Sequence, residues 1–287
     1  MTTPAFDVVQ AYYDERVGDK LRDFTHPLPR IEAAIQTLAD WAPFNPRRIL
    51  EIGCGVGATS WRMARAWPQA EVIGADISPL SIDVANTCFK RPNLSYRAGP
   101  IREGVLNGEF ELVLMMDVYE HIPPTDRKGL HTVLKSLLGA ESRFILTIPT
   151  PSNQDYARIH CPSELQPVDE NIGLSEIATL AEDTNTKLLY YREVGIWRYG
   201  DYFHMVLGKY EDLAEVALRQ PTPEGVAALK QSAKRLLGRP GSKPERRRDY
   251  LGPDLLRPAP ADFAERFHVS SAERRRLASA WLRQEAR

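Results

Sequence analysis

The chain has 287 residues, a length that fits one large domain or one domain with an appendage. Its 43% hydrophobic and 26% charged residues are ordinary for a globular protein, and no apolar run is long enough to span a bilayer. The N-terminus lacks the pattern of a secretion signal, and the 3 cysteines form neither an even disulfide framework nor a paired metal spacing. We therefore expect a cytoplasmic protein without a membrane span.

The formal net charge of −1 conceals an uneven distribution. Between Lys234 and Arg287 there are 14 basic and 7 acidic residues, against 23 and 31 in the rest of the chain. Two interpretations fit this basic tail: a solvated, arginine-rich helical extension, or a surface for an acidic partner such as nucleic acid, anionic lipid or a second subunit.

Residues 5–42 show helical periodicity, which His26-Pro-Leu-Pro29 divides into two predicted helices. Tyr12, Tyr13 and Arg16 lie in the first of them. A cover over a ligand pocket and plain packing against the domain are both compatible with this pair. The apolar face of the second helix is formed by Ile31, Ala34, Ile35 and Leu38.

A glycine-rich turn follows the first strand pattern of the chain. The apolar run that ends at Ile52 is followed by three alternating glycines, Gly53, Gly55 and Gly57, and then by a helical segment at 58–67. This order of strand, glycine turn and helix places a nucleotide-like ligand against bare backbone at a helix N-terminus.

An acidic residue completes the pattern. Asp76 ends a second apolar run, 19 positions after Gly57, which is where a doubly wound fold binds a ribose diol. The glycine spacing is G-x-G-x-G rather than the dinucleotide pattern, and Glu51 precedes it inside the strand. A pyrophosphate would gain nothing from that carboxylate, whereas a cofactor with an amino group and a sulfonium would tolerate it. The sequence therefore predicts a nucleoside-cofactor site.

Further strands and helices alternate along the chain. Ser78 and Pro79 predict a helix start, since serine is a favourable N-cap and proline fits the first helical position. The continuous apolar run at 110–116 is typical of a strand buried in a parallel sheet. Regular alternation with right-handed crossovers predicts a doubly wound α/β sheet. The other expected elements are helices at 78–89 and 125–138 and strands at 94–97 and 144–148.

Residues 150–173 carry three prolines and are expected to be irregular. A loop this long, just past the carboxyl end of a central strand, indicates a ligand-binding role. A helix is predicted at 174–183, capped by Asn171 or Ser175, and an antiparallel hairpin at 188–197 and 202–209 closes the domain near Tyr210.

The remaining residues are predicted to form a helical extension. Helices are expected at 211–237, a proline-rich linker or arm at 239–260, and a closing helical piece at 261–287. We thus divide the chain into an N-terminal helical cap (1–44), a catalytic domain (45–210) and a C-terminal extension (211–287). The apolar contacts expected in the closing piece are Phe263, Phe267, Leu277 and Trp281.

Two segments resemble a known family. The motif E-x-G-x-G-x-G at 51–57 resembles the first motif of class I S-adenosylmethionine-dependent methyltransferases, and Phe110–Ile122 resembles their fourth strand and following turn. The likeness covers about Arg48 to Pro149 and is nearest to the ubiquinone-biosynthesis O-methyltransferases. It implies a Rossmann-like methyltransferase fold with a mostly parallel seven-stranded sheet, S-adenosyl-L-methionine as cofactor, and an N-terminal helical pair that covers the pocket.

The resemblance also implies roles for individual residues. Asp76 would bind the ribose, Ile77 would pack on the adenine, Glu51 would face the methionine amine, and Asp117 would lie beside the methionyl end. Related enzymes often have an acidic residue after the third strand to hold the adenine amine, where this chain has Pro100. The turn residues Gly53, Cys54, Gly55 and Gly57 would let the cofactor approach the main chain closely. We expect Cys54 to fill a small space in this turn and not to act as a nucleophile.

Candidates for the acceptor side lie at strand ends. His121 follows the fourth strand, and a structural, a catalytic and a metal-binding role all fit it, because a similar E-x-x-E-H binds a divalent metal in some relatives. Here Asp117 replaces the first glutamate, and we predict no metal. His160 is the second candidate base. The residues expected to form an aromatic and cationic acceptor wall are Tyr156, Trp197, Arg198, Tyr199, Tyr202 and His204.

These observations predict a methyltransferase that acts on a hydroxyl, or an amine, of a small polar metabolite such as a saccharide or natural product. One alternative is an RNA or protein methyltransferase that docks through the basic tail, although no RNA-binding signature is visible and nucleic acid is not the expected partner. A second alternative is an S-adenosylmethionine-binding partner or sensor without catalysis. A homodimer formed through the C-terminal extension is also compatible with the sequence.

Overall fold

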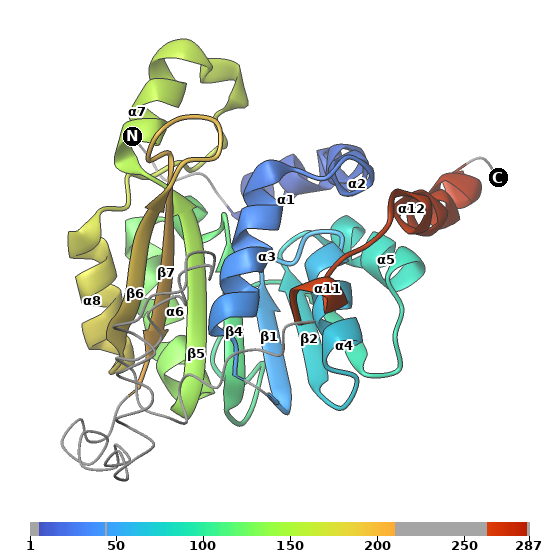
Figure 1. The fold of residues 1–287 in the computed structure, drawn as a ribbon. Helices are drawn as coiled ribbons and strands as arrows, with labels where there is room; N and C mark the ends of the chain where they lie inside the picture. The colour runs from blue at the N-terminus through green and yellow to red at the C-terminus, as the bar shows by residue number, and fades with distance from the viewer. Residues whose placement is uncertain (1–5, 44, 210–262, 286–287) are drawn as a thin grey trace, which may run out of the picture.

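The computed structural model describes residues 6–43, 45–209 and 263–285 (Figure 1). Seven strands form one sheet in the order β3-β2-β1-β4-β5-β7-β6, with β7 antiparallel to both of its neighbours and the other pairs parallel. The predicted doubly wound, seven-stranded sheet is therefore confirmed. Within the described residues, no helix combines the length and apolarity needed to cross a membrane. The strands are β1 (Arg48–Ile52), β2 (Glu71–Asp76), β3 (Leu94–Ala98), β4 (Phe110–Met116), β5 (Leu138–Pro149), β6 (Lys187–Val194) and β7 (Tyr202–Gly208).

Helices cover both faces of the sheet (Figure 1). Helices α3 (Pro29–Trp41) and α4 (Ala58–Ala66) pack on one face, and α6 (Pro124–Leu137) and α8 (Leu174–Thr184) pack on the other. Because successive side chains of a strand point to opposite faces, Ile49 joins the core under α3 and α4, while Leu50 joins the core under α6 and α8. The sheet is thus buried on both sides, and ligand access is left to its ends.

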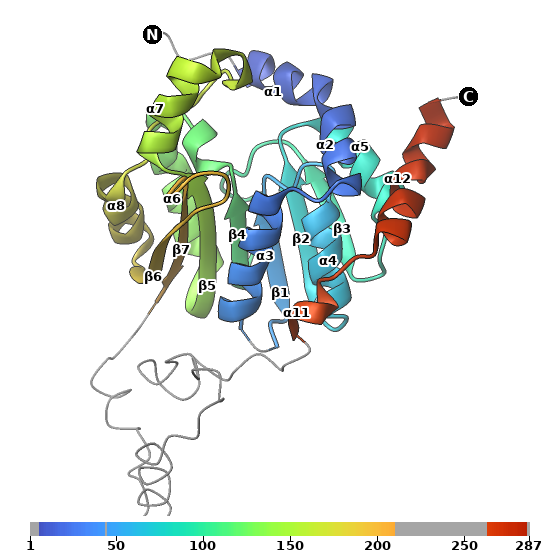
Figure 2. The ribbon, with the colours of Figure 1, turned by 45° about the horizontal axis from the view of Figure 1, so that its top comes forward.

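The N-terminal cap consists of three helices rather than the predicted two: α1 (Phe6–Glu15), α2 (Val17–Thr25) and α3. The break expected near His26 is present, with Pro29 at the start of α3, and a second break at Arg16 separates α1 from α2. Helix α1 buries none of its residues, whereas α2 buries Val17, Leu21 and Phe24. In Figure 2, α1 and α2 lie above the end of the sheet from which the glycine turn emerges.

Residues 150–173 are more regular than predicted, because they contain helix α7 (Pro151–His160) and a short 3₁₀ turn at Pro162–Glu164. The Thr150 hydroxyl accepts a hydrogen bond from the Asn153 amide at 3.2 Å and donates one to the Gly200 carbonyl at 2.9 Å. Thr150 therefore caps α7 and fixes it to the β6–β7 turn. The predicted caps of α8 were wrong, since its N-cap is Gly173. Helix α5 (Pro79–Cys88) does begin at the predicted Ser78 cap.

The C-terminal helices α11 (Phe263–Arg266) and α12 (Ser271–Glu285) return to the N-terminal side of the domain, where α12 packs on α2 and α5. Phe267 is fully buried in the core that α3 and α4 cover, and Leu277 and Trp281 pack against the cluster that contains Phe24. These predicted apolar contacts are confirmed. The Phe263 side chain and the elements expected at 211–237 and 239–260 lie outside the described residues.

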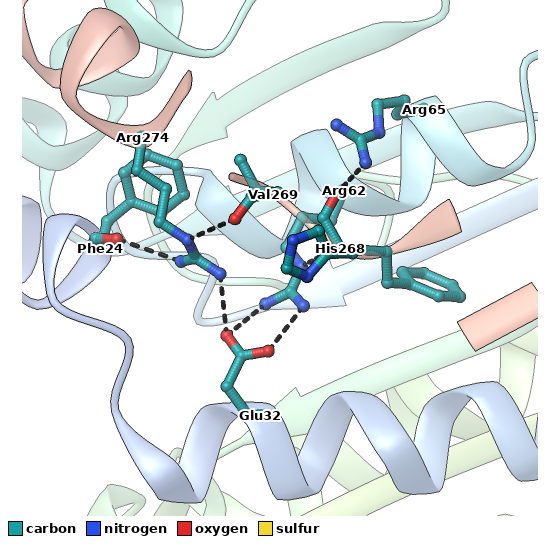
Figure 3. Close-up of polar contacts among 8 residues, drawn as sticks. Phe24, Glu32, Arg62, Arg65, His268, Val269 and Arg274 are labelled. Atoms are coloured by element: carbon teal, nitrogen blue, oxygen red, sulfur yellow. Dashed lines mark hydrogen bonds and ion pairs between the residues drawn. The ribbon is translucent and has the colours of Figure 1, made fainter. Parts of the chain in front are cut away.

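One carboxylate connects three of these segments (Figure 3). Glu32 on α3 accepts two hydrogen bonds of 2.9 Å from Arg62 on α4 and one of 3.1 Å from Arg274 on α12. Arg274 also donates to the main-chain carbonyls of Val269 and Phe24. We refer to Glu32, Arg62 and Arg274 as the Glu32 bridge. It fixes the C-terminal helix to the cap, while the predicted pairing of two copies through the extension stays a prediction.

Candidate functional site

The glycine turn after β1 has the backbone conformation that its sequence requires. Gly53, Gly55 and Gly57 have φ angles of 76°, 53° and 87°, a region that only glycine adopts freely. A Cβ atom on Gly57 would lie 2.6 Å from the hydroxyl of Tyr96, and one on Gly53 would collide with Val118. The backbone angles therefore favour glycine at all three positions, and the surrounding side chains also leave no space for a Cβ at Gly53 and Gly57.

Asp76 holds the turn from the end of β2. One of its carboxylate oxygens accepts a hydrogen bond of 2.7 Å from the Gly55 amide, and the other accepts one of 2.9 Å from the Ser78 amide. The side chain is buried, yet it faces a cavity. Because a carboxylate has about four acceptor positions, these two bonds leave capacity for the hydroxyls of a ligand.

The first cavity has a volume of about 920 Å³ and lies between the turn, the loop after β3 and the segment after β4. Tyr13 and Lys20 of the cap close it from above. It brings together Asp76, Ile77 and Asp117, as the sequence predicted, and Gly99 and Pro100 also line it. Other lining residues are Gly53, Ile101, Val118 and Ile122.

A second cavity of about 680 Å³ adjoins the first. Its wall contains the predicted acceptor residues Tyr156, Trp197 and Tyr202, together with Arg198, whose guanidinium lies 3.7 Å from the centre of the Tyr156 ring. Glu51 of β1 and the turn residues Cys54 and Gly55 also line this cavity. Residues that line both cavities are Tyr13, Lys20, Gly53, Asp117 and His121, so the two spaces meet at the ends of β1 and β4.

Glu51 is buried inside β1, and its carboxylate accepts a hydrogen bond from the hydroxyl of Ser60 on α4. Burial raises the pKa of Glu51 to about 8, although the bond from Ser60 opposes the shift. A cationic group placed in the second cavity beside Glu51 would favour the ionised carboxylate.

Asp117 occupies a strained position at the end of β4. Its φ of 54° is unusual for a residue with a side chain, and its carboxylate forms an ion pair with Arg30 on α3. The main-chain amide of Asp117 donates to Thr147 on β5 at 2.9 Å, which fixes the backbone there. Strain held in this way is common where a binding site requires a particular backbone direction.

His121, on the short 3₁₀ helix η1 (Tyr119–His121), lies where the two cavities meet. Its Nδ1 is 2.7 Å from the Val168 carbonyl and 3.1 Å from the Asp169 carboxylate, and its Nε2 is 2.8 Å from the Gln166 side-chain nitrogen. Burial by itself lowers the pKa of His121, but Glu120, Asp169 and the Val168 carbonyl outweigh burial and raise it above the usual value.

Glu120, next to His121, is a buried carboxylate that belongs to the same motif at 117–121 for which a metal-binding role was considered. Burial raises its pKa against the opposing effect of His121, and its Oε2 atom has no hydrogen-bond partner among the described residues. It lines the second cavity, where an unsatisfied buried oxygen favours a ligand that donates a hydrogen bond. Across the described segments, no three His, Cys, Asp or Glu side chains gather as a metal site would require.

Four predicted site residues line neither cavity. Gly57 is buried inside the glycine turn, and the Tyr199 side chain is fully exposed. His204 on β7 is buried beneath α3, where its Nδ1 is 2.7 Å from the Thr37 hydroxyl, and it lines neither cavity. Burial and the charge of Arg192 lower its pKa to about 4. His160 ends α7 on the exposed surface, with its ring 4.2 Å from that of Tyr156, and it also lines neither cavity. These positions do not support contact with an acceptor.

Sequence analysis missed several residues of the site. Tyr13, Lys20 and Arg30 come from the cap, and Gln166 and Asp169 come from the segment after α7. Tyr13 carried a signal, since it belongs to a predicted cover helix. The others lie in segments whose placement depends on tertiary contacts, such as the 2.7 Å hydrogen bond between the Tyr13 hydroxyl and Gln166.

A doubly wound sheet, a glycine turn held by Asp76 and a cavity at the carboxyl ends of the strands define a nucleoside-binding protein of the Rossmann-like class. Comparison with known families then narrows the class. Residues 49–139 match the methyltransferase domain family. For this part of the chain, the match confirms the predicted resemblance to methyltransferase domains.

Similar proteins agree with this assignment. A ubiquinone biosynthesis O-methyltransferase of Cereibacter sphaeroides is 31% identical over 159 residues, which cover 47% of this chain and 63% of that protein. A malonyl-[acyl-carrier protein] O-methyltransferase of Acetivibrio thermocellus is 28% identical over 112 residues, which cover 39% of this chain and 38% of that protein. The chain thus covers less than two thirds of either relative.

Solved structures show the same fold. The magnesium protoporphyrin IX methyltransferase of Synechocystis PCC 6803, solved with bound S-adenosylhomocysteine, matches with a TM-score of 0.56 and 17% identity over 71% of this chain and 99% of that one. At this identity the likeness concerns the fold alone. It confirms the predicted Rossmann-like methyltransferase fold.

Proposed function

We propose that the protein is an S-adenosylmethionine-dependent methyltransferase that holds its cofactor in the first cavity. Asp76 would bind the ribose hydroxyls, Ile77 would pack on the adenine, and the main chain near Pro100 would face the adenine edge. Gly53, which lines both cavities, would allow the cofactor to approach the backbone closely. The methionyl end would pass the ion-paired Asp117, which lines both cavities, and would place its amine in the second cavity, where Glu51 would face it.

The meeting of the two cavities at Gly53, Asp117 and His121 is the observation that carries this proposal. Methyl transfer is a displacement at carbon, so the acceptor atom must approach the methyl group from the side opposite to sulfur. Alignment of this kind corresponds to effective molarities of roughly 10⁵–10⁸ M. The two cavities adjoin at these residues, which supports an approach of the acceptor in the second cavity toward the methyl group of the cofactor.

His121 is the base that the geometry supports. A hydroxyl acceptor must lose its proton during transfer, and a positioned base contributes about 10²–10⁴ in rate. His121 lines both cavities and has a raised pKa, whereas the other candidate, His160, lies outside them. We therefore assign proton removal to His121.

The wall of the second cavity supports a small polar acceptor with an apolar face. Tyr156, Trp197 and Tyr202 offer aromatic surfaces, Arg198 offers a cation, and the free oxygen of Glu120 accepts a hydrogen bond. A hydroxyl-bearing saccharide or natural product fits this combination, and oxygen is favoured over nitrogen as the methylated atom because a base is present.

Calorimetric titration with S-adenosylmethionine tests the proposal. We expect micromolar binding that weakens at least tenfold in Asp76→Ala, about 1.4 kcal/mol. Asp83→Ala, which removes an exposed carboxylate from α5, serves as the control and should bind as the wild type does. Absence of binding to the wild-type protein would refute the cofactor assignment.

The purified protein also distinguishes the proposed enzyme from the two alternatives, a non-catalytic S-adenosylmethionine sensor and an RNA methyltransferase. A working enzyme retains the product S-adenosylhomocysteine, whereas a sensor retains unreacted cofactor only. An RNA methyltransferase that docks through the basic extension would bind RNA with an affinity that falls steeply with salt.

A further inference from the structure

A chain of hydrogen bonds connects the cap to His121. The Tyr13 hydroxyl donates to Gln166 Oε1 at 2.7 Å, and Gln166 Nε2 donates to His121 Nε2 at 2.8 Å. On the other side of the ring, His121 Nδ1 donates to the Val168 carbonyl at 2.7 Å. These contacts join α1, the segment after α7 and η1, which are far apart in the sequence.

The surroundings of Nδ1 determine where one proton must be. Both of its neighbours, the Val168 carbonyl and the Asp169 carboxylate, only accept hydrogen bonds, so Nδ1 carries a proton in every state. Nε2 is thus the atom whose protonation changes. Because Gln166 presents an N–H group to Nε2, the ring in this structure is the neutral tautomer with a lone pair on Nε2.

The same heavy atoms can also accommodate the cation. Rotating the Gln166 amide by 180° exchanges its oxygen and nitrogen, so the oxygen would accept from a protonated Nε2. The Tyr13 hydroxyl can then accept from the amide nitrogen, since a phenol is both donor and acceptor. The main chain of Gln166 stays in place, because its amide donates to Asp169 at 2.6 Å.

We propose that Gln166 is a positioning residue that selects the protonation state of His121, with its orientation set by Tyr13. The assignment of His121 as the base rests on the proposed function, whereas the hydrogen-bond relay does not. With Tyr13 donating, the amide keeps Nε2 free of a proton and ready to act. With the amide reversed, Gln166 stabilises the imidazolium.

During transfer to a hydroxyl acceptor, His121 would take up the proton that the acceptor loses. The hydroxyl replaces the Gln166 amide at Nε2 and gives its proton to that atom. An oxygen lone pair forms the new bond to the methyl carbon, and the carbon–sulfur bond breaks, which leaves neutral S-adenosylhomocysteine. After the methylated product leaves, the reversed amide accepts from the imidazolium until its proton passes to water.

The carboxylates around the His121 ring favour its protonated form, whereas the Gln166 amide favours its neutral form. Glu120 lies 3.6 Å from Nε2, Asp169 lies 3.1 Å from Nδ1, and Arg30 on α3 faces Glu120. The two carboxylates favour the cation and raise the pKa of His121. Tyr13, the residue of α1 that is hydrogen-bonded to Gln166, acts through that amide and favours the neutral ring.

Nitrogen-15 NMR of the histidine rings tests the relay, with His121 assigned through His121→Gln. In the wild type we expect the neutral Nδ1–H tautomer above the pKa of His121. Gln166→Glu places a carboxylate against Nε2 and should raise that pKa by about 1–3 units. Tyr13→Phe frees the amide to reverse and should raise it by a smaller amount, without introducing a charge.

Tyr12→Phe is the matched control, because it removes the neighbouring phenol, which pairs with Arg16 rather than with Gln166. The acid limb of the pH profile of kcat/KM should move upward with the NMR value in the two test variants and stay in place in the control. An unchanged His121 pKa in both test variants would overturn the relay. Shifted NMR values without any methyl transfer would instead refute the proposed function and leave the relay standing.

Discussion

Replacing Arg274 by methionine should destabilise the protein because it removes the C-terminal member of the Glu32 bridge. The Arg274 side chain is only 5% exposed and donates three hydrogen bonds, to Glu32 at 3.1 Å, to Phe24 O at 3.0 Å and to Val269 O at 3.1 Å. Methionine fills similar space but donates none of them. The substitution therefore leaves two carbonyls without these donors at the contact between α12 and α2.

The expected cost follows from those contacts. Each buried group left without a partner costs about 1–3 kcal/mol, while Glu32 keeps both of its bonds to Arg62. We expect a loss of about 3 kcal/mol in the free energy of unfolding, at the lower end of the roughly 3–5 kcal/mol measured when one partner of a buried pair is removed. For a domain of this size, that corresponds to a fall in Tm of roughly 6–12 °C.

The pH dependence gives a second, independent expectation. Burial by itself raises the pKa of Glu32, but the Arg62 and Arg274 guanidiniums outweigh it and hold this pKa below its usual value of 4.5. A carboxyl whose pKa is lowered on folding contributes stability above its unfolded pKa, and this contribution is lost as the pH falls through the folded value. The difference between wild type and Arg274→Met should therefore narrow below about pH 4.5.

Urea unfolding followed by tryptophan fluorescence and circular dichroism measures both quantities. Arg276→Met on the same helix is the matched control, since the Arg276 side chain is 70% exposed and should change stability by less than about 0.5 kcal/mol. If the two variants were equally stable, the packing of α12 on α2 described above would be wrong.

Two further substitutions test the glycine turn and the buried histidine. Gly57→Ala should cost at least about 1–3 kcal/mol and abolish cofactor binding, because φ is 87° and the new Cβ would lie 2.6 Å from the Tyr96 hydroxyl. Gly18→Ala, on an open helix surface, should instead stabilise by about 0.5–1 kcal/mol in the same denaturation assay. His204 stays neutral down to about pH 4 when folded but is protonated below about pH 6.5 when unfolded, so stability should fall by up to about 1.4 kcal/mol for each pH unit lost in this interval. His204→Asn should flatten that slope in urea titrations, and an unchanged slope would contradict the assigned pKa.

The sheet and the position of the glycine turn beside Asp76 could be predicted because their signals are local. Strand β1, its glycine turn and α4 are consecutive, and Asp76 follows from the length of one crossover. Each of these residues is placed by backbone hydrogen bonds of adjacent elements, such as the contact of Gly55 with Asp76.

The acceptor side was predicted less well because it depends on distances that a sequence pattern does not fix. Tyr202 pairs with Pro149 at the carboxyl end of β5 and lines the second cavity. His204 pairs with Thr147, two residues further along β7. At about 3.3 Å per residue, His204 lies roughly 7 Å from that end of the strand, beneath α3. The sequence predicted the correct strand end but could not distinguish these two positions.

The relay at His121 could not be predicted for a different reason. Tyr13, His121 and Gln166 belong to three segments whose contacts appear only after the cap folds over the sheet. Gln166 has no charge and no characteristic motif, so nothing in the sequence separates it from an ordinary surface glutamine.

Helices α1 and α2 of the N-terminal cap are held to the domain by different interactions. This difference affects how an acceptor could enter the cavities. Helix α2 buries Val17, Leu21 and Phe24, so separating it from the domain would expose apolar surface. Helix α1 buries no residue, and its polar contacts include the bonds of Tyr13 to Gln166 and of Asp14 to Ser78. Because water replaces such bonds at a net cost of only about 0.5–1.5 kcal/mol each, α1 is the more weakly held part of the cover. In the proposed mechanism an acceptor takes the place of Gln166 at His121 and also disturbs one of those bonds, so occupation of the proposed base and loosening of α1 would be physically linked.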